Sequence, residues 1–304
     1  MNKASLIEVN IADIGPGDFF KVSKKNYPPA LNVSLNMSGI LEVPYIFKTG
    51  SAYDILTCHN RIKILRESGV TGLKCFVLDE PDVNIFLNHV SLKAYRNELG
   101  PIGKLRTLFL ISSFFKLQET VKKDFCSKVL KLPLDIAENE VLLNKIMEFP
   151  DILISYLDEK DISFKVIKDL SMLPYGWIAV VNSWLNSIQV RVNIFRMLTD
   201  NLFDIYRRGD KLQDIESMVF NDDKTLFDTI YRARYPEFSR LKSKSDGIIN
   251  QLSLSGLTID FPEYFDRGFV TIKLDINKNS DCSEQLKKIS KINVEKLKEL
   301  ISFL

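Results

Sequence analysis

The chain has 304 residues, 45% of them hydrophobic and 26% charged, which excludes disordered and collagen-like classes and suggests two or three domains. The 41 Lys and Arg residues nearly balance the 39 Asp and Glu residues, so any contact with nucleic acid must be a local patch. Four scattered cysteines and two histidines exclude a zinc finger or a disulfide scaffold. With no apolar leader and no apolar run of about 20 residues, we expect a cytoplasmic protein with no membrane contact.

The first part of the chain reads as a small mixed α/β domain, which we place at residues 1–95. Its β-branched and aromatic runs are bounded by Gly, Pro, Ser and Asp, a pattern typical of short strands. A helical period from Cys58 to Ser68 lies between the third and fourth runs, and Gly69 ends it. The expected strands are residues 6–10, 43–47, 52–57 and 73–78.

Residues 96–252 have an almost wholly helical pattern and form the second expected domain. Apolar residues recur at three- and four-residue spacing, and Pro133, Pro150 and Pro174 interrupt the pattern. The longest expected helical stretch covers residues 178–208. Shorter helices are expected at 119–131, 138–148, 151–158 and 162–172.

Residues 253–304 form a third expected domain of two strands and one helix. Alternating apolar and polar residues predict strands at 257–261 and 269–276, and a helix is expected from about 283 to 304. Such a unit is too small to bury its own apolar face, so we expect it to dock on the helical body or on a second copy. The expected fold class is therefore α+β.

Residues 31–79 resemble the amino-terminal domain of ParB-type partition proteins. A short helix carrying Ser34 and Leu35 is followed by Gly39 and Ile40. A strand, a phosphate-binding turn with the start of a helix, Gly69 and a further strand then follow in the family's order. The strand covers residues 53–56, and the turn with the helix start covers 58–65.

The resemblance continues to about residue 175. Residues 98–105, with Arg96 just before them, are similar to the segment that opens the family's helical middle, and 147–174 are similar to the helices after its helix-turn-helix. The resemblance implies a ParB/sulfiredoxin-like first domain and a helix-turn-helix-like second one. It also implies a homodimer, double-stranded DNA as a partner in chromosome or plasmid partition, and a partition ATPase as a further partner.

The resemblance places a nucleotide site at the turn, with CTP and Mg as the implied cofactors. The family's turn is Gly-Glu-Arg-Arg, whereas this chain has Cys58, His59, Asn60 and Arg61. The family's Glu-Asn-x-Gln-Arg motif falls on residues 92–96, where only Arg96 matches. Because the carboxylate and amide that help to hold a metal-bound triphosphate are missing, hydrolysis is not expected. The expected nucleotide-binding residues are Gly39, Ile40, Cys58, His59, Asn60, Arg61 and Arg96.

The helix-turn-helix is expected at residues 121–149, but its charge does not suit DNA. The family's recognition helix begins Ser-Arg-Ser, while this chain has Ala137, Glu138 and Asn139, followed by Glu140. Acidic side chains there would repel the phosphate backbone. Positive charge gathers instead in residues 231–244, interleaved with aromatic rings, which suits DNA or equally a helix that packs its rings inward. The candidate DNA-binding residues are Arg232, Arg234, Arg240, Lys242 and Lys244.

Two alternatives to a nucleotide-gated DNA-associated protein stay open. One is a ParB-derived protein-interaction scaffold that binds neither nucleotide nor DNA. The other is a phosphotransfer enzyme, because the turn also resembles the Gly-Cys-His-Arg of sulfiredoxin, in which a cysteine attacks a sulfinic acid. Cys58 and His59 carry that second resemblance, although Asn60 separates His59 from Arg61.

Overall fold

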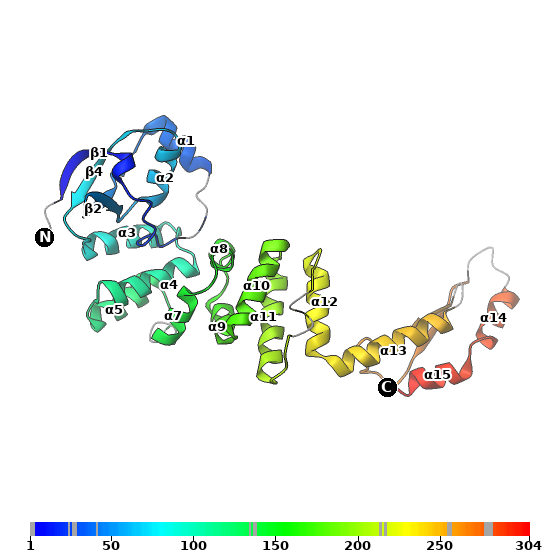
Figure 1. Ribbon diagram of the computed structural model, residues 1–304. Helices are drawn as coiled ribbons and strands as arrows, with labels where there is room; N and C mark the ends of the chain where they lie inside the picture. The colour runs from blue at the N-terminus through cyan, green and yellow to red at the C-terminus, as the bar shows by residue number, and fades with distance from the viewer. Residues whose placement is uncertain are drawn as a thin grey trace. The chain divides into compact units, whose positions relative to one another are not determined.

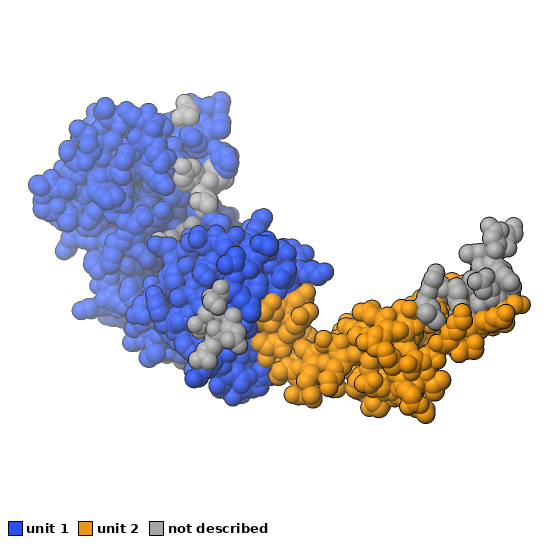
Figure 2. All heavy atoms as spheres, turned by 45° about the vertical axis from the view of Figure 1, so that its right-hand side comes forward, with its two compact units in different colours: residues 1–226 blue, residues 227–304 orange. Residues whose placement is uncertain are grey.

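The computed structural model describes residues 4–304 except 24, 26–28, 41, 134, 136–138, 213–214, 216–217, 254–256 and 277–281. The chain has two compact units, residues 1–226 and 227–304 (Figure 2). Helices and two small sheets confirm the α+β class, while the division into three domains stays a prediction. Within the described residues, no helix is both long and apolar enough to cross a membrane.

A four-stranded sheet forms the start of the first unit, in the order β1-β4-β2-β3 (Figure 1). Strands β2 and β4 are parallel, and the other two pairs are antiparallel. The parallel pair needs a crossover, which the helix α2 provides between β3 and β4. All four expected strands and the expected helix after the third are therefore confirmed. The elements are β1 Ser5–Asn10, α1 Pro29–Ser38, β2 Tyr45–Thr49, β3 Ala52–Ile55, α2 His59–Glu67 and β4 Gly72–Leu78.

Aliphatic side chains of the strands and of α2 form one buried core. Alternate residues of β4 point into it, as the period of two along a strand requires. Ile62 of α2 is fully buried there, which fixes this helix on the sheet. The buried members are Val9, Ile11, Ile14, Ile46, Ile55, Ile62, Leu73, Cys75 and Val77.

The rest of the first unit is helical, as expected, and α4 is held by a carboxylate from a distant helix. Asp158 is fully buried and accepts a hydrogen bond from the backbone N–H of Gly103 at 3.0 Å, in the first turn of α4. A negative charge stabilises this end of a helix. The helices are α3 Val83–Tyr95, α4 Pro101–Phe109, α5 Glu119–Phe125, α7 Glu140–Met147, α8 Asp151–Glu159, α9 Phe164–Met172, α10 Tyr175–Ser187 and α11 Val192–Arg207, with π-helical turns at Leu110–Phe114 and Cys126–Leu130. The helix α12 Asp223–Arg234 begins in the first unit and has most of its residues in the second.

The expected helical stretch over residues 178–208 is two helices, so that expectation was wrong. Ile188 has an extended backbone, with φ −135° and ψ 153°, which ends α10. After the break, the backbone N–H and the guanidinium of Arg191 donate three hydrogen bonds to the buried carboxylate of Asp223. Periodicity continues through the break because Val190 and Phe195 are both buried, so the pattern alone does not reveal it.

The expected recognition helix corresponds to α7. Ala137 and Glu138 lie outside the described residues. Asn139 caps the helix, because its side-chain oxygen accepts a hydrogen bond from the backbone N–H of Leu142 at 3.0 Å. That oxygen is therefore engaged in holding the helix start, and Glu140 lies exposed beside it.

The second unit is built on α13 Pro236–Leu252. Strands β5 Leu257–Asp260 and β6 Thr271–Leu274 pair antiparallel, as expected, and share a buried core with α13 and α15 Val294–Ile301. The single helix expected at the C-terminus was wrong: α14 Cys282–Ser290 precedes α15. Asn293 makes the new start, because its side chain accepts a hydrogen bond from the backbone N–H of Lys296.

Candidate functional site

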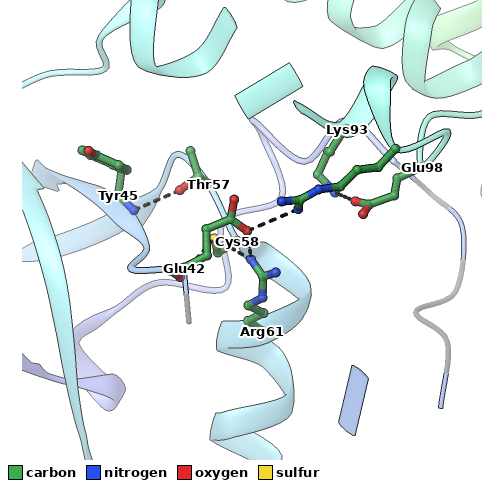
Figure 3. A network of polar contacts seen from close by, with 8 residues as sticks. Glu42, Tyr45, Thr57, Cys58, Arg61, Lys93 and Glu98 are labelled. Carbon is green, nitrogen blue, oxygen red and sulfur yellow. Dashed lines mark hydrogen bonds and ion pairs between the residues drawn. The ribbon is translucent and has the colours of Figure 1, made fainter. Parts of the chain in front are cut away.

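A sharp turn joins β3 to α2 and places the start of that helix at the edge of the sheet. The hydroxyl oxygen of Thr57 accepts a hydrogen bond from the backbone N–H of Tyr45 at 2.9 Å, which ties the turn to β2 (Figure 3). The carbonyl of Cys58 then accepts from the N–H of Ile62, the first bond of the helix. The backbone N–H groups in the first turn of α2 have no partners within the helix, and the side chain of Cys58 does not cap them. The turn therefore offers backbone donors to an anion.

Cys58 occupies a backbone conformation that favours glycine. Its φ is +63° and its ψ is 27°, in the left-handed region. A residue with a Cβ pays a conformational cost there, whereas glycine does not. Glycine would adopt this conformation at the first position of the turn without that cost. In this chain the position holds a buried cysteine.

The turn faces a cavity of about 250 Å³, at the small end of typical ligand sites. The segment before α1, the start of α2 and the face of α3 provide its walls. Five of the seven expected nucleotide-binding residues line it: Cys58, His59, Asn60, Arg61 and Arg96. Gly39 and Ile40 are not among its lining residues, and Ile40 packs against the hydrophobic core of the sheet.

The cavity is rich in cations, and each of them has a carboxylate partner. Five Lys and Arg side chains line it, against the two carboxylates Glu42 and Glu98. Two of the cations pair with acidic residues that are not in the lining, at Asp18 and Asp161. The five pairs are Lys21–Asp18, Lys25–Asp161, Arg61–Glu42, Lys93–Glu98 and Arg96–Glu42.

Glu42 is the carboxylate that reaches both arginines. Its Oε2 contacts Nη1 of Arg61 and lies 3.9 Å from Nη1 of Arg96 (Figure 3). Nη1 of Arg61 also lies 3.3 Å from Sγ of Cys58. Burial raises the pKa of Glu42, but the hydrogen bond and charge of Arg61, with the charge of Arg96, outweigh this and lower it. The carboxylate is therefore ionised at neutral pH.

Both histidines of the chain line the same cavity. His59 is 9% exposed, and its Nε2 has no hydrogen-bond partner among the described residues. Burial, with a smaller contribution from neighbouring cations, lowers the pKa of His59 to about 3 and that of His89 to about 4. Both rings are neutral at pH 7.

The cavity residues fit a phosphate group. Guanidinium groups and helix N–H groups are the donors that phosphate oxygens prefer. Within the described residues, no group of three His, Cys, Asp or Glu side chains is placed to hold a metal ion. The donors of the cavity therefore suit binding of a phosphorylated molecule.

Cys58 is poorly placed for nucleophilic attack. Burial raises the pKa of its thiol, and the charge of Arg61 and its hydrogen bond only partly oppose this. Since the thiolate is the nucleophile, a protonated buried thiol disfavours the sulfiredoxin-like alternative.

Sequence reasoning named Arg96 but missed His89 and Lys93, which α3 contributes to the cavity wall. His89, Lys93 and Arg96 follow each other at i, i+4 and i+7, which places them on one helix face. That spacing was the available signal. Lys21 and Glu42 lie in irregular segments, where no periodic pattern marks a site.

The candidate DNA-binding residues lie in the second unit, at the end of α12 and in α13. Arg240 pairs with Glu237 and Lys242 with Asp246, so part of the positive charge is compensated. The guanidinium of Arg234 lies 4.8 Å from the ring centre of Tyr235. Arg232 and Lys244 are exposed, while Tyr231 and Phe238 are half-buried and contact each other. Rings packed inward and cations facing water are therefore both present.

No family model and no curated protein matches this chain. Solved structures that match it include the C-terminally truncated chromosome-partitioning protein ParB from Caulobacter crescentus complexed to the centromeric parS site. That match has 11% identity and a TM-score of 0.29, and covers 64% of this chain and 98% of the ParB chain. The same protein complexed with CTP-gamma-S matches at 12% identity and a TM-score of 0.24, covering 60% and 99%. Because one fold can carry many functions, the function of this chain has to be inferred from its own residues.

Proposed function

We propose that this protein binds a phosphorylated nucleotide in the cavity at the start of α2. The carrying observation is the meeting of two kinds of anion donor there: the backbone N–H groups at the start of α2, and the guanidinium groups of Arg61 and Arg96. Five Lys and Arg side chains line this cavity against two carboxylates, which favours an anionic ligand. The phosphate would contact Arg61 and the turn.

The family resemblance in the sequence makes the proposal more specific. It suggests CTP as the nucleotide and a cytoplasmic, homodimeric, DNA-associated protein in partition or regulation, with a partition ATPase as a further partner. In this proposal the nucleotide controls association with double-stranded DNA. The candidate basic stretch at residues 231–244 would supply phosphate contacts.

Calorimetric titration of the full chain with CTP, ATP and GTP tests the nucleotide site. We expect saturable binding of at least one of them, with CTP the tightest. If none of the three binds, the nucleotide proposal is wrong.

Salt-dependent DNA binding separates the proposal from the scaffold alternative. Neutralising several phosphates releases counterions, so the affinity for duplex DNA should fall steeply between low and moderate salt, and it should change when the nucleotide is added. A scaffold that binds neither would show no DNA affinity at low salt. The comparison therefore uses the same chain with and without CTP.

A further inference from the structure

Glu42 occupies a hydrogen-bond donor of Arg61 that an anionic ligand would use. Its carboxylate contacts Nη1 of Arg61, and both side chains are largely shielded, with 31% and 23% of their surfaces exposed. Carboxylate and phosphate oxygens make the same kind of contact with a guanidinium group. Nη1 of Arg61 has two N–H groups, and one faces Glu42 while the other faces Sγ of Cys58, so a phosphate reaches this nitrogen only by displacing one of them.

The second arginine makes this carboxylate different from the other one in the cavity. Glu42 also lies 3.9 Å from Arg96, at the end of α3, so one carboxylate neutralises cations from two helices. Among the described residues, Glu98 pairs with Lys93 alone, at 3.6 Å. Loss of either glutamate removes one negative charge from the cavity, but only Glu42 contacts the expected phosphate-binding arginine.

We propose that Glu42 is an internal competitor of the ligand: it occupies Arg61 and Arg96 when the cavity is empty, and the phosphate must displace it. This inference rests on the proposed nucleotide site. It implies that the parent protein binds the phosphate more weakly than the cavity cations would if Glu42 were not paired with them. It also implies that Glu42 acts through Arg61, not through the general charge of the cavity.

The test compares CTP binding by the parent, Glu42→Gln and Glu98→Gln proteins. Glutamine keeps the size and hydrogen-bonding ability of the side chain, so Arg61 stays in place while the charge is lost. We expect Glu42→Gln to tighten binding about tenfold, equal to about 1.4 kcal/mol. Glu98→Gln, the matched loss of one charge, should tighten it less than about threefold.

A third comparison places both Arg61→Ala and Glu42→Gln in one chain. If Glu42 competes for Arg61, the gain from Glu42→Gln disappears in the Arg61→Ala background. An equal gain from both glutamate variants, or weaker binding by Glu42→Gln, overturns the inference while leaving the nucleotide site intact. No binding by any of the proteins overturns the nucleotide site and the inference with it.

Discussion

The carboxylate of Glu42 and the guanidinium of Arg61 form an ion pair at the N-terminal end of α2, where Arg61 also contacts the sulfur of Cys58. Glu42 precedes β2, and Arg61 lies in the first turn of α2, so the pair joins the two sides of the cavity. The pair, and not an isolated arginine, is what a ligand meets. At the proposed site, ligand binding is therefore expected to exchange one anion for another.

The buried histidines predict that the fold loses stability in mild acid. The pKa of His59 is about 3 and that of His89 about 4, both below the ordinary value of 6.5. The unfolded chain thus binds more protons than the folded one between about pH 6.5 and pH 4, so the free energy of unfolding falls as the pH falls. We expect a loss of about 2 kcal/mol between about pH 6 and pH 5, measured by urea denaturation.

The His59→Gln variant is the control for this pH dependence. It removes one of the two titrating groups, so its free energy of unfolding should fall about half as steeply over the same interval. An unchanged slope in this variant would show that His59 is not the source of the acid sensitivity.

We expect the Asp223 carboxylate to contribute strongly to the stability of the helical part of the chain. It is buried and accepts three hydrogen bonds from Arg191, whose backbone N–H would lose its partner on truncation. Asp223→Ala should lower the free energy of unfolding by about 2–3 kcal/mol. Its neighbour Asp222 accepts from Thr225 and from the backbone N–H of Lys224 at the exposed start of α12, so Asp222→Ala should cost about 1 kcal/mol. Equal costs would contradict the role given to Arg191.

Cys58 should react slowly with alkylating reagents. Its thiol is buried and its pKa is raised, so little thiolate is present at neutral pH. Peptide mapping after iodoacetamide treatment should find Cys58 unmodified in the native protein and fully modified after denaturation. Native Cys58 that reacts as fast as an exposed thiol would restore the sulfiredoxin-like alternative.

If the protein binds DNA, the basic stretch at 231–244 should matter more than α7. Each cation that neutralises a phosphate adds about 0.9 to the salt slope, so replacing Arg232, Arg234 and Arg240 with Ala should lower the slope by up to about 2–3 units. The ion pair of Arg240 with Glu237 favours the lower end of that range. Fluorescence anisotropy with duplex DNA at several salt concentrations measures it.

The matched control replaces three exposed lysines of the first unit, Lys63, Lys74 and Lys165, with Ala. It removes the same charge and should change the slope by less than about one unit. Glu140→Ala should leave binding intact or tighten it. Normal DNA binding by the arginine variant, with binding lost on changing Asn139, would show that α7 reads DNA.

Local patterns predicted the strands and helix α2 because their signals are short-range. The alternation in residues 73–78 and the helical period after Cys58 both reflect packing on one core. The breaks at Ile188 and Asn293 escaped prediction. At the first break, the chain is bound through Arg191 to the carboxylate of Asp223, which is distant in sequence. At the second, Asn293 caps the start of α15 within a continuous apolar period.

The site was predictable only where it lies on one turn. Cys58 to Arg61 are neighbours in sequence, so one motif brought them together. Lys21, Glu42 and Lys93 come from three separate segments, and only the folded sheet and α3 place them around the same cavity. The left-handed backbone of Cys58 was also not visible, since cysteine is not a residue that marks such a turn.

The most direct measurement of the central claim is CTP binding by the parent, Arg61→Ala and Lys63→Ala proteins. Both variants lose one positive charge from α2, but Lys63 is exposed and does not line the cavity. A charge-assisted phosphate contact is worth about 1.5–3 kcal/mol, so Arg61→Ala should weaken binding roughly ten- to a hundredfold, with Lys63→Ala close to the parent. Equal affinities of all three proteins, or no binding by the parent, would contradict a phosphate site at the start of α2.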